Sequence, residues 1–94
     1  MEVTVRFIGA FRTISGKSKL TIEYRDMPNV KKTVEKIVEE LPKLKGALID
    51  ADLQDPRPNT LILLNGREIS ILNGLETMLK NGDEIVFVPV SHGG

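Results

Sequence analysis

The sequence predicts an α+β fold in which one main helix packs on one face of a mixed β-sheet. Two observations lead to this prediction. Residues 3–8 and 84–90, near the two ends of the chain, have the apolar patterns of strands. Residues 30–41, between them, carry apolar side chains at helical spacing. Because one helix can cover only one face of a sheet, a two-layer domain is the simplest packing.

Length and composition narrow the class of protein. The chain has 94 residues, which predicts one domain, and its 13 basic residues balance 13 acidic ones. Nucleic-acid-binding domains are usually clearly basic, so we expect no nucleic-acid partner. The absence of cysteine excludes disulfides and thiolate chemistry. We see no signal pattern and no apolar run approaching ~18 residues, which predicts a cytoplasmic protein without a membrane segment.

The N-terminal third predicts a hairpin. Residues 3–8 and 20–24 alternate apolar with polar side chains, as half-buried strands do. Gly9 and Ser15-Gly16 predict a turn over residues 9–17, so the two strands are expected to pair with each other. The side chains expected to face the helix are Val3, Val5, Phe7, Leu20, Ile22 and Tyr24.

The middle of the chain predicts one amphipathic helix of about three turns. Asn29 is placed to cap its start, and Pro42 is placed to stop it. In the less regular stretch that follows, Leu44 and Leu48 predict a short helical turn. The sequence Asp-Pro-Arg-Pro at residues 55–58 predicts an extended loop.

The remaining residues predict three further strands at 60–64, 67–69 and 84–90. Asn65-Gly66 is a preferred pair for a type I′ hairpin turn, and residues 81–83 also have turn composition. Leu75, Met78 and Leu79 are expected to pack on the core. The order strand, strand, helix, strand, short strand, strand is that of the ubiquitin-like β-grasp. We therefore expect a β-grasp domain over residues 1–90 and a flexible tail over residues 91–94.

The sheet face away from the helix is expected to carry apolar side chains. Ile85 and Phe87 are assigned inward, so period-two geometry sends Ile8, Val86 and Val88 to the opposite face. Two residues of the apolar strand 60–64 should join them. This pattern predicts a docking patch for a partner protein. The alternative is that these side chains are scattered on the surface or covered by residues 43–58.

The end of the sequence, Gly93-Gly94, is the second candidate feature. Glycine has no Cβ, so such a tail is thin and flexible enough to enter a narrow channel. From Pro89 to Gly94 an extended chain spans about 20 Å, at ~3.3 Å per residue. The carboxylate of Gly94 is then the group on which a partner enzyme acts. The alternative is a frayed end without a function.

Three stretches resemble the ubiquitin-like sulfur carriers, and within them the small subunit of molybdopterin synthase. Val-Arg-Phe-Ile-Gly-Ala-Phe-Arg at residues 5–12 is similar to that family's first strand and the turn after it. Leu-Lys-Asn-Gly-Asp-Glu-Ile at residues 79–85 is similar to its lead into the last strand. Residues 87–94 resemble its ending of two aromatics, two prolines and a Gly-Gly pair. Val88, Val90 and His92 depart from that ending.

The resemblance implies a function for the tail. An adenylating enzyme related to ubiquitin-activating enzymes would use ATP to activate Gly94, and sulfur transfer would give a thiocarboxylate. The tail, with Gly93 and His92 as its approach, would then enter the large subunit of molybdopterin synthase. This chain would bind no cofactor and would have no active site of its own, since it has no phosphate-binding loop and no nucleophile–base pair.

Other functions and other residues remain as alternatives. Gly94 would serve equally in a ubiquitin-like modifier that forms isopeptide bonds with lysines of target proteins, and a plain interaction module is a third possibility. We interpret His92 as a solvated spacer rather than a proton-transfer group. It is the only histidine, so a metal site there is not expected either. The acidic residues are expected to be solvated loop acids rather than a cation site. These residues are Asp50, Asp52 and Asp55. The arginines 6, 12 and 67 are candidates for pairing with acidic residues of a partner.

Overall fold

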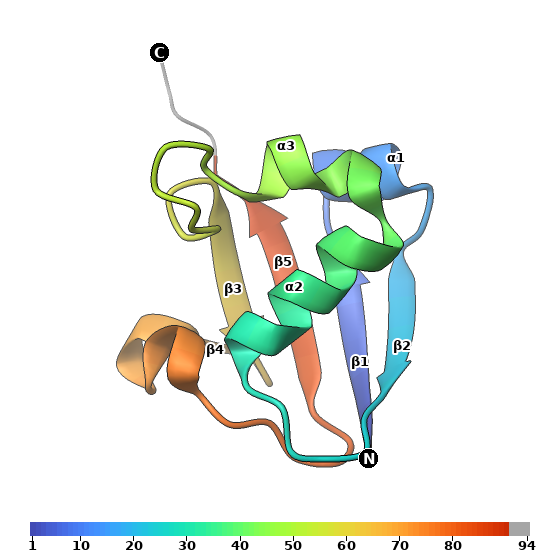
Figure 1. Cartoon of the computed structure of the whole chain (residues 1–94), viewed down its shortest axis with the longest axis vertical. Coiled ribbons are helices and arrows are strands. Elements are labelled where there is room, and N and C mark those ends of the chain that lie inside the picture. Colours follow the sequence, from blue (N-terminus) through green and yellow to red (C-terminus); the bar gives the residue numbers. More distant parts are fainter. Residues whose placement is uncertain (91–94) are drawn as a thin grey trace.

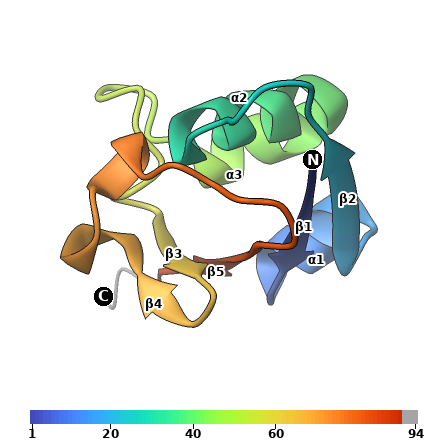
Figure 2. The ribbon, with the colours of Figure 1, turned by 90° about the horizontal axis from the view of Figure 1, so that it is seen from below.

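The computed structural model describes residues 1–90 of the chain, and it has two layers. One layer is a five-stranded sheet with the strand order β2-β1-β5-β3-β4. The other layer contains α2 (Val30–Glu40), which crosses one face of the sheet diagonally (Figure 1). Figure 2 shows α2 and the short α3 (Lys45–Leu48) on the same side of the sheet. This arrangement confirms the predicted β-grasp.

The two central strands come from opposite ends of the sequence. β1 (Glu2–Phe7) and β5 (Glu84–Pro89) pair in parallel, and all other strand pairs are antiparallel. The outer strands are β2 (Lys19–Glu23) next to β1, and β3 (Thr60–Leu64) with β4 (Arg67–Glu68) next to β5. The hairpin of β1 and β2 is therefore confirmed. The carboxyl ends of both central strands meet at one end of the sheet.

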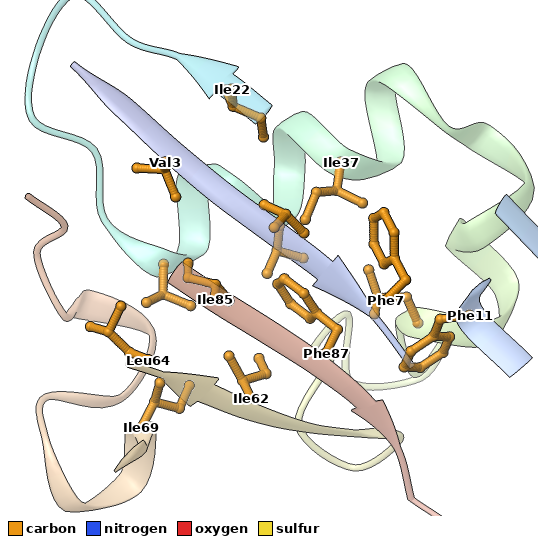
Figure 3. Packing of buried hydrophobic residues seen from close by; sticks show 14 of the residues in the cluster. Val3, Phe7, Phe11, Ile22, Ile37, Ile62, Leu64, Ile69, Ile85 and Phe87 are labelled. Atoms are coloured by element: carbon orange, nitrogen blue, oxygen red, sulfur yellow. The ribbon is translucent and has the colours of Figure 1, made fainter. Parts of the chain in front are cut away.

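The core lies between α2 and the sheet (Figure 3). The predicted inward residues of β1 and β5 are all at most 1% exposed. Phe7 and Phe87 lie with ring centroids 6.3 Å apart. The other buried apolar side chains are Val3, Val5, Phe11, Ile22, Val30, Val34, Ile37, Leu44, Leu48, Ile62, Leu64, Ile69, Leu79 and Ile85. Leu20 and Tyr24 are half-buried and pack against this cluster.

Several local predictions are confirmed. The Asn29 side chain accepts a hydrogen bond of 2.8 Å from the backbone N–H of Lys32 and so caps α2. After α2, the 3₁₀ helix η1 (Pro42–Leu44) and α3 form the predicted helical turn, with Leu44 and Leu48 fully buried. Asn65 and Gly66 have φ values of 49° and 83°, as a type I′ turn requires.

The turn predicted over residues 9–17 is wrong, because this segment contains α1 (Ala10–Ser15). Phe11 is 2% exposed and Ile14 is half-buried, a spacing of three that places both on one helical face. Gly9 and Gly16 flank the helix with φ values of 56° and 72°. Burial of Phe11 in the common core stabilises a helix that would be too short to form alone.

Three further predictions need correction. Met78 is 50% exposed rather than packed on the core. It forms an isolated antiparallel β-bridge with Asn29, and in this extended backbone the side chains of Met78 and Leu79 point to opposite sides, so only Leu79 is buried. β4 ends at Glu68, and the buried Ile69 begins the 3₁₀ helix η2 (Ile69–Ile71). Residues 55–58 do not extend but turn, with Pro56 buried. The last 3₁₀ helix, η3 (Gly74–Glu76), precedes Met78.

Candidate docking face and tail exit

An apolar strip runs along the sheet face that α2 leaves uncovered. Its residues are Ile8, Leu61, Leu63, Val86 and Val88. Leu61 lies directly opposite Val88, and Leu63 lies opposite Val86. Their neighbours in sequence point into the core, so alternation sends these side chains outward.

The strip is accessible. Ile8 is 45% exposed and Leu61 is 37% exposed, while the other three members are half-buried. Residues 43–48 do not cover it, since Leu44 and Leu48 pack in the core on the other side of the sheet. Ile8, Val86 and Val88 therefore lie together on the predicted face. Their role in docking stays a prediction.

A polar margin borders the strip on the β1 and β2 side. Arg6 lies opposite Val86, and its Nε donates to Glu84 at 2.7 Å. Lys19 lies opposite Arg6 on the next strand. An apolar centre beside a charged, hydrated margin is the usual composition of a protein–protein interface.

The chain leaves the sheet at the end of this strip. The backbone N–H of Ile8 donates to Phe87 at 3.1 Å, and that of Val90 donates to Asn59 at 2.9 Å. β5 is thereby held by a neighbour on each side up to its last residues. Four residues follow Val90, and a fully extended chain of that length spans about 13 Å. His92, Gly93 and Gly94 lie outside the described residues, so the predictions for the tail stay predictions.

Two carboxylates of the acidic loop, those of Asp50 and Asp55, accept hydrogen bonds from residues close in sequence. Asp50 accepts hydrogen bonds from the backbone N–H groups of Asp52 and Leu53, at 3.0 and 2.9 Å. The hydrogen bond from the Arg57 side chain holds the pKa of Asp55 below its ordinary value, against a smaller effect of burial. Across residues 1–90, no cluster of three or more histidine, aspartate or glutamate residues has the geometry of a metal site.

Two features of the docking face and tail exit could not be assigned to particular residues from the sequence: the outward side chains of β3 and the contact that holds the end of β5. The outward members of β3 could not be chosen from its sequence, because residues 61–64 are all apolar and show no alternation; burial of Ile62 and Leu64 assigns the other two to the open face. The role of Asn59 could not be predicted from the sequence, because it accepts the hydrogen bond from Val90 with its backbone carbonyl, a group that every residue has.

The fold and its exposed strip define a class, the ubiquitin-like β-grasp proteins. Small archaeal modifier protein 1 from Methanosarcina acetivorans, solved in solution, superposes with a TM-score of 0.85 and 28% identity. The alignment covers 99% of this chain and 96% of that one. Within residues 1–90, no helix has both the length and the apolar character that crossing a membrane requires.

Sequence comparison then gives the family. The model of the ThiS family matches residues 5–94, and this chain belongs to the ThiS family. Small archaeal modifier protein 3 of Haloferax volcanii is 33% identical over 94 residues, which cover 99% of this chain and 100% of that protein. A putative sulfur carrier protein of Archaeoglobus fulgidus is 33% identical over 67 residues, which cover 68% of this chain and 76% of that protein. The resemblance to ubiquitin-like sulfur carriers is thereby confirmed.

Proposed function

We propose that this chain is a sulfur carrier for molybdopterin synthesis, the small subunit of a molybdopterin synthase, whose C-terminal carboxylate at Gly94 becomes a thiocarboxylate. The observation that carries the proposal is the position of the apolar strip. It follows β5 to the point where the chain leaves the sheet, so a partner that covers the strip also receives the tail. The likeness to a putative sulfur carrier supports the sulfur chemistry. The molybdopterin branch rests on the resemblance of residues 5–12, 79–85 and 87–94.

The chemistry needs an activated carboxyl group. A carboxylate oxygen of Gly94 attacks the α-phosphorus of ATP, and pyrophosphate leaves. Hydrosulfide from the sulfur donor then attacks the acyl carbon, the carbon–sulfur bond forms, and the bond to AMP breaks, which leaves the thiocarboxylate. The sequence has no phosphate-binding loop, so ATP and the adenylation site belong to the partner enzyme. The chain contributes the strip that orients the tail and the carboxylate that reacts.

Intact-mass measurement tests this proposal. The wild-type chain is incubated with the adenylating enzyme of its own organism, ATP and a sulfur donor. We expect a mass increase equal to the replacement of one oxygen by sulfur, located in the C-terminal peptide. A variant lacking Gly94 is the control and should gain nothing. A wild-type mass that stays unchanged under these conditions contradicts the proposal.

A second candidate function is protein modification through an isopeptide bond from Gly94 to target lysines. The observation that favours it is the 33% identity, over nearly the whole chain, to a small archaeal modifier protein. Both functions use the same activated carboxyl group, and they differ in the nucleophile that attacks it. Affinity-tagged chain expressed in native cells should then give a ladder of covalent conjugates that disappears when Gly94 is deleted. Conjugates that persist without Gly94 contradict this second function.

A further inference from the structure

An open basic cleft of about 630 Å³ lies beside the end of β5 at Pro89 and Val90, where the chain leaves the sheet. We call this place the tail exit. The cleft is formed by α1 and by the turn that leads to β2. The lining residues are Gly9, Arg12, Thr13, Gly16, Lys17 and Ser18. Two of them are cationic and none is acidic. Throughout residues 1–90, neither Arg12 nor Lys17 forms an ion pair, and both are exposed.

The cleft lies next to one end of the apolar strip and to the end of β5. Gly9 lines the cleft and directly follows Ile8 of the strip. A Cβ atom built on Gly9 would lie 3.6 Å from Pro89 Cγ, so the ring of Pro89 lies next to Gly9. Figure 1 shows α1 at the end of the sheet where β5 finishes. Any partner that covers the strip and takes the tail therefore also reaches the cleft.

Lys19 extends the positive charge from the cleft onto the open face. It lies directly opposite Arg6 in the β1–β2 ladder, and like charges in that position destabilise a sheet. Glu84 neutralises Arg6 through their ion pair, whereas no ion pair with residues 1–90 neutralises Lys19. The acidic groups at 50 and 55 bond within their own loop. The α1 side of the tail exit therefore carries positive charges, from Arg12, Lys17 and Lys19, that no ion pair within residues 1–90 neutralises.

We propose that Arg12 and Lys17 bind carboxylate side chains at the rim of the channel through which the adenylating enzyme admits the tail. This inference rests on the proposed function. Adenylation is common to sulfur transfer and to lysine conjugation, so the partner is the same for either outcome. An acidic protein fits better than a nucleic acid, because the cleft adjoins an apolar strip and the net charge of the chain is zero.

The exposure of both side chains sets the expected effect. Charges at an interface rim act mainly on the rate of encounter and on orientation, and salt screens them. Losing both should raise the KM of the adenylating enzyme for this chain by about tenfold at low salt. The kcat should stay unchanged, because charges at an interface rim act on encounter rather than on the chemical step. In about 1 M salt, where the Debye length falls to about 3 Å, the difference should disappear.

The test compares the double variant Arg12→Gln/Lys17→Gln with the matched control Lys31→Gln/Lys32→Gln. Both variants remove two positive charges from exposed positions, but the control pair lies at the start of α2, away from the exit. ATP–pyrophosphate exchange by the purified adenylating enzyme of the same organism gives KM and kcat. We expect a raised KM only for the cleft variant. Thermal unfolding of all three proteins shows whether each is folded.

Each outcome has one meaning. No exchange with the wild-type chain contradicts the proposed function itself. Exchange with the same KM for wild type, cleft variant and control overturns the cleft assignment alone, as does a change in kcat without a change in KM. Binding of labelled single-stranded RNA that depends on Arg12 and Lys17, with unchanged enzyme kinetics, would assign the cleft to nucleic acid and also overturn it.

Discussion

Single side chains hold together segments that are far apart in the sequence. Asn65 donates from Nδ2 to Asp83 at 2.9 Å and accepts from the backbone N–H of Glu84 at 2.9 Å. Asn81 accepts from the backbone N–H of Glu2 at 2.8 Å. Amide side chains both donate and accept, so one residue can satisfy backbone groups that a strand end leaves unpaired. Turn residues here also connect the two ends of the chain.

Tyr24 gives a prediction at this scale. Burial raises the pKa of its phenol, although a hydrogen bond of 2.9 Å to Thr33 lowers it in part. Tyr24 is the only tyrosine and the chain has no tryptophan, so the phenolate absorbance reports this group alone. We expect a titration midpoint above about 10 in the folded protein and near 10 in urea.

The pH dependence of stability follows in sign. Because the folded pKa of Tyr24 is the higher one, its contribution to the free energy of unfolding is complete below the unfolded pKa. It is lost as the pH rises through the folded pKa. Tyr24→Phe should remove this alkaline loss, as urea unfolding at a series of pH values measures. Equal midpoints in the folded and unfolded chain would contradict the assignment.

At the scale of elements, β5 separates two roles by its alternation. Ile85 and Phe87 are fully buried under α2, while Val86 and Val88 lie in the apolar strip. A strand can stabilise the fold with one set of side chains and present the other set to a partner, because successive side chains point to opposite faces. Substitutions at neighbouring positions should therefore have different consequences.

Val88→Asp tests this separation. The variant should fold, since Val88 is already half-exposed. Its affinity for the proposed large subunit of molybdopterin synthase should fall about 100-fold, because an unpaired charge in a desolvated interface costs ~3 kcal/mol. Isothermal titration calorimetry measures the affinity. Met27→Asp, at an exposed apolar position just before α2, is the control and should bind normally. If Val88→Asp unfolds the protein, Val88 belongs to the core instead.

α1 provides a second prediction for an element. Phe11→Ala should lower the free energy of unfolding by about 3–5 kcal/mol, because it removes a side chain that is only 2% exposed. Thr13→Ala, on the exposed side of the same helix, should change it by less than about 0.5 kcal/mol. Urea denaturation compares the two. Similar small effects from both would mean that α1 contributes little to the core.

At the scale of the whole molecule, one core is shared by the strands and helices of residues 1–90 (Figure 3). Leu79, which lies in no helix or strand, is fully buried in this core. The backbone N–H of Leu79 donates to Pro28 at 2.9 Å, just before α2 begins. A single core favours cooperative unfolding of the entire domain.

We therefore expect two-state unfolding. Far-ultraviolet circular dichroism and Tyr24 fluorescence should give the same midpoint in urea. Leu79→Ala should lower the free energy of unfolding by about 2–5 kcal/mol and move both midpoints together. Different midpoints for the two signals, in the wild type or in this variant, would show that the region around Tyr24 unfolds independently of the rest of the domain.

Elements with strong local patterns could be predicted from the amino-acid sequence. The alternation in β1, β2 and β5 and the apolar stripe of α2 fixed which side chains face the core, since a period of two or 3.6 leaves one apolar face. Asn29, Pro42 and Asn65-Gly66 placed boundaries through their own backbone preferences. The outward direction of Ile8, Val86 and Val88 followed from the same alternation.

Features that depend on contacts between distant residues could not be predicted from local patterns. α1 is too short to be stable alone, so its existence depends on burial of Phe11 against the common core. The exposure of the Met78 side chain depends on the β-bridge between Met78 and Asn29. The basic cleft reaches the tail exit because β1 pairs in parallel with β5 and brings Gly9 to Pro89. Local propensities carry no information about such pairings, which are set by how the whole chain buries its apolar surface.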